Sequence, residues 1–570
     1  MHTTTLDTAA PRTDHSTGEA GSEIHLDGVG WRTSDGAQLV ADVSAHIAPG
    51  ELVGIVGASG AGKSTLLRLI SGALTPTTGT VHVDGAPADR LDAGRRLELA
   101  VVPQDDHLPA DLTVRSVLTY AARLRLPAGS SRSDVDEAVA RGLRAVELEE
   151  VADRAVRQLS GGQRRRASIA AEMVAGPRAC LLDEPTSGLD PVTAATVMSE
   201  LDGISDDGRT VVITTHDAAD LARCDRILAL APGGRLAFDG TLADAMAEAG
   251  TTDLDRVHRA LTHGRLSLGS SGLQGRERPQ APTPAPWMTP RTRRPGRLRQ
   301  WHALTSRSIE NMRRNRLTLA ILVGSPAMVI AMFAVLFNRG AFDASAPSPT
   351  TTVMIAFWVA FGGFFFGLTY GLLQLCSEIT MISRERRAGV AVWLQVLAKV
   401  TALAPILVLI DLSMLIVLRW LGRLPATDTG TTATLAVTLI LDSLAALTVG
   451  LLASAAVRSP AQAALALPML CFPAVLFSGA ILPVPAMAVA GRGISAAMSS
   501  RWAFEAIGND LSLRSLFSND PSPFGSALLD QYGDTWTTST TTVWLVLAVF
   551  TAVTGVAAWA TLAARSRDAR

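Results

Sequence analysis

The residues with the clearest chemical potential form the glycine-rich stretch GASGAGKST at positions 57–65. It follows the apolar run ELVGIV, which predicts a buried strand, and precedes LLRLI, which continues with helical spacing. In this context the glycines let backbone N–H groups converge on phosphates, and the helix N-terminus adds partial positive charge. Lys63 would reach the outer phosphates and Ser64 would ligate Mg²⁺. The predicted phosphate cradle comprises Gly57, Ala58, Ser59, Gly60, Ala61, Gly62, Lys63, Ser64 and Thr65.

Other polar residues follow predicted strands further along the chain. In LLDEP at positions 181–185, Asp183 would hold Mg²⁺, directly or through water, and Glu184 would polarise the attacking water as general base. Gln104 would contact Mg²⁺ and the water, and His216 would contact the γ-phosphate. Each of these residues alone is explained at least as well as a cap or a structural histidine. Their occurrence together, in one order, favours a nucleotide site.

Two further features complete the predicted site. The motif LSGGQ supplies an expected helix start, which is another anion-binding end. Its predicted contact residues are Ser160, Gly161, Gly162 and Gln163. Trp31 precedes the cradle and offers a flat ring for an adenine base, although a tryptophan at a strand edge is often only packing. The expected ligands are therefore a nucleotide with its phosphates and Mg²⁺, and the family resemblance described below implies that the nucleotide is ATP.

These motifs lie in a segment, residues 24–264, that predicts one α/β domain. Apolar strands are expected at 99–102, 179–182, 210–213 and 226–230. They alternate with helical patterns, as in a largely parallel sheet, and residues 112–175 predict a helical insert. Residues 1–23 predict a disordered tail without a signal peptide, and residues 265–296 have the composition of a flexible linker.

The second half of the chain is strongly apolar, so the whole chain has 48% hydrophobic residues and a mean hydropathy of +0.26. Segments long enough to cross a ~30 Å hydrocarbon core are expected at 317–337, 351–375, 395–418, 432–457, 461–482 and 542–563. We therefore expect an all-α membrane domain with six spans at 317–570, preceded by an amphipathic connecting helix at 297–316. A long external loop is expected at 483–541.

Charge and cysteine usage narrow the function and the orientation. A formal net charge of −1 gives no support for a nucleic-acid partner. The four cysteines show neither a disulfide framework nor a zinc spacing. Nine arginines lie between positions 291 and 316, whereas the loop at 483–541 holds three arginines and five acids. The positive-inside rule therefore places both termini and the α/β domain in the cytoplasm, with Arg339, Arg419 and Arg423 as exceptions on the outer side.

The order of cradle, Gln104, LSGGQ, LLDEP and His216 resembles that of the ATP-binding cassette family over residues 24–264. The resemblance implies ATP hydrolysis coupled to transport. It also implies that LSGGQ completes the site of a second cassette packed head to tail. Because this chain carries one cassette with all of the motifs, the expected partner is a second copy of itself or a close paralogue.

A cassette followed by a linker and six spans resembles the subfamily G half-transporters, the white/pleiotropic drug resistance type with an ABC-2-like permease. RRRASIA, PTSGLD, FSG and SRWAFEA carry this likeness, whereas His216-Asp217 and the lack of external cysteines depart from eukaryotic members and fit a bacterial relative. By the same resemblance, SRERRAG at 383–389 is a coupling helix on which cassette closure acts. Its expected residues are Glu378, Arg384, Glu385 and Arg386. A merely solvated charge run is the alternative.

Drug-exporting relatives place a substrate-clamping aromatic residue where Phe366 falls, and an apolar plug where Ala480 and Ile481 fall. Phe361 and Phe365 share a helix face at i, i+4. These five residues form the expected substrate cavity, with packing against lipid or other helices as an equal alternative.

Two acids, Asp411 and Asp442, lie inside predicted spans. They would pair with Arg419 or a polar neighbour, or bind a cationic substrate. The sequence as a whole predicts an ATP-driven exporter, a homodimer that moves a hydrophobic or amphipathic small molecule or lipid outward. An importer of the same architecture and a membrane ATPase that senses without transporting are the alternatives. Six spans exclude a soluble cassette protein of the translation or chromosome type.

Overall fold

The computed structural model describes residues 21–104, 106, 108–262, 295–343, 348–520 and 523–568. The chain forms two compact units, Met1–Pro295 with Arg387–Gly389, and Gly296–Arg386 with Val390–Arg570. The expected tail at 1–23 lies outside the described residues except for its last three, and the expected linker at 265–296 except for its last two.

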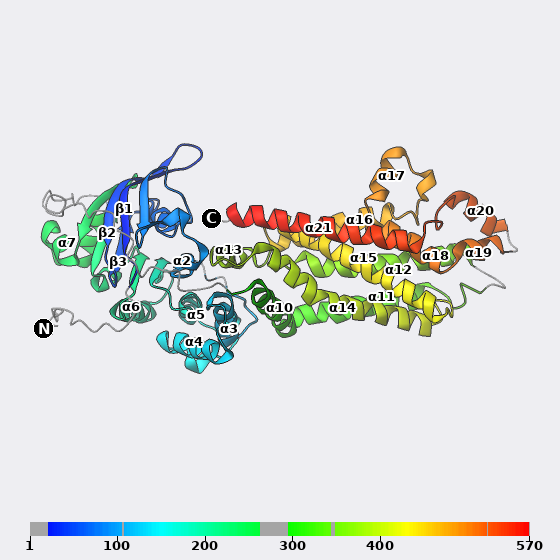
Figure 1. Cartoon of the computed structure of the whole chain (residues 1–570), viewed down its shortest axis with the longest axis horizontal. Coiled ribbons are helices and arrows are strands. Elements are labelled where there is room, and N and C mark those ends of the chain that lie inside the picture. Colours follow the sequence, from blue (N-terminus) through cyan, green and yellow to red (C-terminus); the bar gives the residue numbers. More distant parts are fainter. Residues whose placement is uncertain are drawn as a thin grey trace. The chain divides into compact units, whose positions relative to one another are not determined.

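A six-stranded sheet in the order β10-β9-β3-β8-β7-β6 organises the first unit (Figure 1). The strands are β3 (Leu52–Gly57), β6 (Leu99–Val102), β7 (Ala179–Asp183), β8 (Thr210–Thr214), β9 (Arg226–Leu230) and β10 (Leu236–Gly240). All neighbours are parallel except β10, which pairs antiparallel with β9. The four strands predicted from apolar runs are confirmed as β6, β7, β8 and β9. Because the strands are parallel, the carboxyl ends of β3, β6, β7 and β8 meet at one edge.

A second, antiparallel sheet was not predicted. It has the order β2-β1-β4-β5 and consists of β1 (Ile24–Arg32), β2 (Gln38–Ile47), β4 (Thr78–Val83) and β5 (Ala86–Pro87). Buried residues of β1 and β2 share one core with helix α1 (Lys63–Ile70), which begins at the end of the cradle. The antiparallel sheet thus covers the helix that starts at the phosphate-binding loop.

The predicted helical insert is confirmed. Between residues 112 and 175, all of which are described, the structure has helices and one isolated bridge but no strand. Its main helices are α3 (Val114–Arg125), α4 (Arg132–Ala145) and α5 (Gly161–Met173). The other α-helices in the described part of the unit are α2 (Ala93–Leu97), α6 (Pro191–Asp206), α7 (Leu242–Ala249) and α8 (Leu254–Thr262). Apolar residues of α3, α4, α5 and α6 pack with the parallel sheet in a second core.

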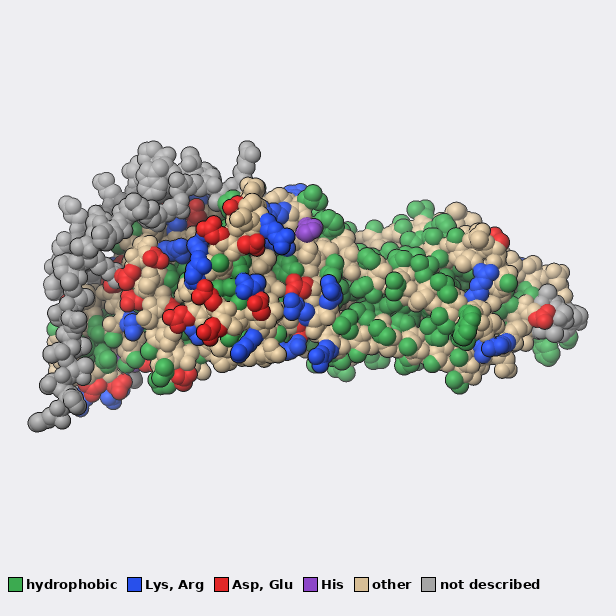
Figure 2. Space-filling view, turned by 90° about the horizontal axis from the view of Figure 1, so that it is seen from below, with side chains coloured by type: hydrophobic (Ala, Val, Ile, Leu, Met, Phe, Trp, Pro, Cys, Tyr) green, Lys and Arg blue, Asp and Glu red, His purple; other side chains and the backbone are tan. Residues whose placement is uncertain are grey.

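The second unit is helical throughout its described part. Five of its helices are long and apolar enough to cross a membrane, namely α11 (Arg316–Leu336), α12 (Pro349–Leu372), α14 (Val392–Trp420), α15 (Thr429–Ala456) and α21 (Thr540–Asp568). Figure 2 shows a band of hydrophobic side chains over this unit with few charged ones among them. The unit therefore has the surface and helix lengths of a multi-pass membrane protein.

At the expected sixth span, 461–482, the structure has an apolar helix that is shorter than the five long ones. The structure has only α16 (Pro460–Leu476) there, an apolar helix of 17 residues, with Pro468 and Pro473 inside it. At ~1.5 Å per residue such a helix reaches about 25 Å, short of the ~30 Å core. The chain leaves the helix at Phe477, and Gly479 has a φ of 87°. The left-handed backbone at this glycine prevents the helix from continuing through the predicted remainder.

The other α-helices in the described part of the second unit have 18 residues or fewer. They are α10 (Arg297–Arg314), α13 (Ile379–Arg387), α17 (Val489–Ala496), α18 (Ser499–Asp510), α19 (Leu513–Ser518) and α20 (Pro523–Tyr532). The segment expected as a long loop is thus largely helical. It is anchored by Trp536, which is buried against the rings of Phe504, Phe517 and Tyr532.

Candidate nucleotide site

The cradle is closed around the side chain of Lys63. Its Nζ is buried and donates to the backbone oxygens of Gly57 at 2.8 Å and Ala58 at 3.2 Å. Gly62 has a φ of 94°, and a Cβ there would lie 2.1 Å from the carbonyl oxygen of Leu39. Only glycine fits this position without shifting β2. The loop therefore surrounds the Lys63 ammonium with backbone groups at the start of α1. This arrangement is suited to binding phosphate oxygens.

Oxygen ligands of the kind that Mg²⁺ prefers lie next to the cradle. The Ser64 hydroxyl donates to Oδ1 of Asp183 at 3.0 Å, and the Thr214 hydroxyl donates to the same oxygen at 2.6 Å. A serine oxygen and a carboxylate at this separation fit a hard divalent cation that also keeps waters and binds phosphates. The structure thus brings together Ser64 and Asp183, two of the three residues predicted to ligate the metal.

The third predicted metal contact, Gln104, meets the expected base. Its Nε2 donates to Oε2 of Glu184 at 2.9 Å, and Nδ1 of His216 lies 3.4 Å from the same oxygen. Glu184 has a φ of 46°, and its backbone N–H donates to the Thr214 hydroxyl at 2.9 Å. Left-handed backbone at a residue other than glycine costs roughly 1–3 kcal/mol and is concentrated at functional sites. Three strand ends thus converge on one carboxylate.

Two residues in these loops were missed by sequence reasoning. The hydroxyl of Thr214 contacts both Asp183 and Glu184. Asp220 accepts hydrogen bonds from Thr186 at 2.7 Å and Thr215 at 2.5 Å, so it joins the loop after Glu184 to the loop before His216. Burial raises the pKa of Asp220 above its usual range, while the two hydroxyl donors oppose that shift. The sequence signal that could have identified Asp220 is its position four residues after His216.

The LSGGQ residues form the expected helix start. Ser160 caps α5, accepting from the backbone N–H of Gln163 at 3.2 Å, and Gln163 accepts from the N–H of Ser160 at 3.2 Å. Ser160 and Gly161 are exposed. Residues 57–65 and 160–163 are all described, and no hydrogen bond joins the two groups. The second anion-binding end is therefore exposed and makes no hydrogen bond to the cradle of its own chain.

Trp31 lies one strand away from the cradle. It pairs in register with Val40 of β2. The adjacent residue of β2, Leu39, is the one whose carbonyl packs against Gly62. Trp31 is half-buried against the core of the antiparallel sheet. Its position beside the cradle is compatible with contact to a base, and its inner face is packed.

The residues expected to line a substrate cavity separate into two groups. Phe366 is 0% exposed and stacks on Tyr370, with ring centroids 6.5 Å apart, so it does not face any surface of this unit. Ala480 is also buried, and its carbonyl accepts from the Tyr532 hydroxyl at 2.6 Å. Phe361 and Phe365 are half-buried with centroids 6.2 Å apart, and Ile481 is 54% exposed. Of the five residues, these last three are at least partly exposed in this unit.

The predicted coupling residues are held by specific contacts, so the alternative of a solvated charge run is wrong. Glu385 is buried and accepts from both terminal nitrogens of Arg307 and from Nε2 of Gln395, the last at 2.6 Å. Arg386 donates to the carbonyl of Ala563 at 2.6 Å and to Ser566 at 2.7 Å. The neighbouring pair is Lys399 and Glu378, with 2.7 Å between Nζ and Oε1. Arg384 is buried as well.

The two intramembrane acids are fully buried in the helical unit. Asp411 accepts from the hydroxyl of Ser443 at 2.7 Å, and that hydroxyl also lies 3.1 Å from the carbonyl of Gly363. Arg419 instead contacts Thr432 and the carbonyl of Thr427, so Asp411 meets a polar neighbour rather than Arg419, and binding of a cationic substrate stays an alternative.

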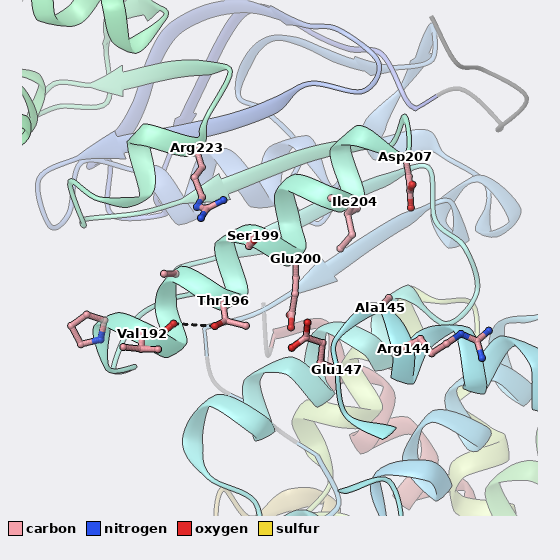
Figure 3. A pocket seen from close by; sticks show the side chains of 13 residues that line it. Arg144, Ala145, Glu147, Val192, Thr196, Ser199, Glu200, Ile204, Asp207 and Arg223 are labelled. Carbon is pink, nitrogen blue, oxygen red and sulfur yellow. Dashed lines mark hydrogen bonds between the residues drawn. The ribbon is translucent and has the colours of Figure 1, made fainter. Parts of the chain in front are cut away.

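A cavity of about 920 Å³ lies between the end of α4 and α6, away from all predicted site residues. Figure 3 shows Glu147 and Glu200 pointing toward one another there. Glu200 is 3.3 Å from Arg166, and burial raises the pKa of Glu200 to about 7 although Arg166 opposes the shift.

Comparison with known proteins places this geometry in a family. The ABC transporter model matches residues 40–187, and the ABC-2 type transporter model matches residues 299–509. The chain is 31% identical over 502 residues to the ABC transporter ATP-binding/permease protein Rv1747 of Mycobacterium tuberculosis, covering 85% of this chain and 57% of that protein. The chain thus spans little more than half the length of this relative.

Two other relatives match a shorter part of the chain. Nod factor export ATP-binding protein I of Rhizobium sp. (strain N33) is 35% identical over 218 residues, covering 38% of this chain and 71% of that protein. ABC transporter G family member 5 of Arabidopsis thaliana is 40% identical over 200 residues, covering 34% of this chain and 30% of that protein. Such membership implies ATP hydrolysis coupled to transport. The chain belongs to the ATP-binding cassette transporter family, with an ABC-2 type membrane domain similar to that of the subfamily G half-transporters.

Proposed function

We propose that the chain is an ATP-driven exporter that works as a homodimer in the cytoplasmic membrane and moves a hydrophobic or amphipathic small molecule or lipid outward. One observation carries the proposal. Lys63, Asp183 and Glu184 converge at one sheet edge, whereas LSGGQ lies at the exposed start of α5 without a bond to the cradle. A site divided in this way is complete only when a second cassette supplies the start of its own α5. In a two-fold dimer each copy does this for the other, so two complete sites form.

The residues of this chain have distinct roles in the proposed hydrolysis. Nζ of Lys63 would exchange its two backbone acceptors for phosphate oxygens, and the oxygens of Ser64 and Asp183 would hold Mg²⁺. The bound metal would neutralise charge on the β- and γ-phosphates. Glu184 would accept the proton of the attacking water. Gln104 and His216, both next to its Oε2, would orient that water and the γ-phosphate.

The membrane half supports the direction and the cargo class. The surplus of arginine before the first long helix favours a cytoplasmic cassette. Phe361, Phe365 and Ile481 offer aromatic and apolar surface that suits a lipophilic substrate. The Nod factor relatives are named as export proteins. The coupling assigned to the segment around Glu385 remains part of the proposal.

A Glu184→Gln variant of the full chain in lipid discs tests the hydrolysis step. Removal of a general base lowers turnover by ~10²–10⁴-fold, while ATP binding should persist because Lys63 and Ser64 are untouched. A Glu147→Gln variant is the matched control, since the Glu147 side chain is 75% exposed. Turnover of Glu184→Gln equal to that of the wild type would contradict the assignment of the base.

Direction and cargo require a flux measurement. Inside-out vesicles should accumulate fluorescent lipophilic dyes or labelled lipids when ATP is supplied, and Glu184→Gln vesicles should not. Accumulation only in right-side-out vesicles with internal ATP would instead establish import. ATP hydrolysis with no flux and no stimulation by any dye or lipid would establish a sensing ATPase. The mass of the particle in discs checks the homodimer.

A further inference from the structure

Arg165 joins three segments of the cassette through one side chain. It lies on α5, two residues after LSGGQ, and is 4% exposed. Its Nε donates to the carbonyl of Pro185 at 3.1 Å and its Nη2 to the carbonyl of Asp183 at 2.8 Å. These two carbonyls flank Glu184. One edge of the guanidinium therefore binds the backbone on both sides of Glu184, the expected base.

The other edge of the guanidinium holds the segment that carries Gln104. Nη1 of Arg165 lies 2.6 Å from the carbonyl of Pro103, 3.0 Å from the carbonyl of Gln104 and 3.1 Å from Oδ1 of Asp106. The amide of Gln104 then reaches Oε2 of Glu184 at 2.9 Å. Arg165 thus fixes the backbones of both partners in that hydrogen bond.

We infer that Arg165 is a positioning residue that keeps Gln104 and Glu184 of its own ATP site in register and ties them to the signature helix α5. The inference rests on the proposed function, in which the start of α5 serves the site of the partner copy. A displacement of α5 when ATP binds at the partner's site would then be carried by a single rigid side chain to the base of the first site. Each site would sense whether the other is occupied.

The geometry needs arginine rather than any cation. A guanidinium is planar and presents donors along two edges, whereas a lysine ammonium is a single point at the end of a flexible stem. In this chain, five acceptors are divided between the two segments. A lysine can satisfy one segment but cannot bridge both.

The test compares Arg165→Lys and Arg165→Gln with the wild-type full chain in lipid discs. Misplacement of a catalytic group by about 1 Å can cost ~10²-fold in rate, so we expect kcat to fall by ~10–10²-fold in both variants. KM and the Kd of a fluorescent ATP analogue should stay within about threefold, because the cradle is unaltered. Arg132→Gln is the matched control, since the Arg132 side chain is 90% exposed and its nearest acid is 3.9 Å away.

Mixed dimers separate positioning within one site from coupling between sites. A dimer of one wild-type and one Arg165→Gln subunit, isolated with two affinity tags, should hydrolyse ATP at well below half the wild-type rate and without cooperativity in ATP. A rate of half the wild type with unchanged cooperativity would overturn the coupling. Wild-type kcat in Arg165→Lys would overturn the positioning. If the wild-type protein itself has no ATPase activity, the proposed function is contradicted instead.

Discussion

The contact between Arg307 of α10 and Glu385 of α13 permits a sharp prediction about stability. The two side chains are 7% and 10% exposed, and both terminal nitrogens of the arginine reach the carboxylate. Gln395 donates a further hydrogen bond at 2.6 Å. The ion pair is therefore desolvated and closely fitted, so each charge depends on the other for compensation.

Removing one partner takes the counter-charge of this buried contact away from the other. Arg307→Gln leaves the carboxylate of Glu385 with Gln395 as its remaining strong donor, and Glu385→Gln leaves the guanidinium of Arg307 facing an amide. Breaking such a pair typically costs about 3–5 kcal/mol. In the double variant both charges are absent, so its cost should fall short of the sum of the single costs by at least ~2 kcal/mol.

The assay is reversible unfolding of the full chain in mixed micelles, followed by tryptophan fluorescence, for the wild type, both single variants and the double variant. A matched surface pair is Arg314 with Glu310, whose side chains are 43% and 27% exposed. Its single variants should each cost less than ~1 kcal/mol. Additive costs for the Arg307 and Glu385 variants, or single costs as small as those of the surface pair, would refute the reasoning.

Two further predictions concern the cassette. Gly62→Ala should weaken binding of a fluorescent ATP analogue far more than Gly60→Ala. Both glycines have positive φ, but the added Cβ would lie 2.1 Å from the Leu39 carbonyl oxygen at position 62 and would meet nothing within 4 Å at position 60. Equal losses of binding in the two variants would assign the effect to backbone strain alone. Folding raises the pKa of Glu200 from 4.5 to about 7, so its stabilising contribution is complete below about pH 4.5 and is lost as the pH rises through 7. The Tm of Glu200→Gln should therefore fall less than that of the wild type between pH 5 and 8, and parallel curves would contradict the shift.

The parallel sheet could be predicted because β6, β7, β8 and β9 are largely apolar runs, and the first three end at or shortly before a polar residue with an expected role. Asp183 and His216 are examples, and the structure places both at the shared edge. The antiparallel sheet could not be predicted in the same way. Its strands β1 and β2 mix buried and exposed positions, with irregular register near Val29 and Trp31, so the period of two is interrupted.

The contacts between loops could also not be predicted from the sequence. Nothing local distinguishes Arg165 from Arg164 and Arg166, since all three follow LSGGQ on one helix turn. Only the packed fold shows that the middle one is buried among carbonyls. In the membrane half, hydropathy located the helices, but it could not distinguish Phe366, which is buried, from Phe365, which is half-exposed, because both are equally apolar.

The hydroxyl of Thr214 donates to the carboxylate of Asp183, the proposed metal ligand, and accepts from the backbone N–H of Glu184, the proposed base. One oxygen atom thereby sets the position of two groups with different duties. Under the proposed roles, affinity for the divalent ion and speed of water attack are consequently linked through this hydroxyl. A substitution of Thr214 would then disturb both, so adaptation to a different metal supply would favour changes at other residues.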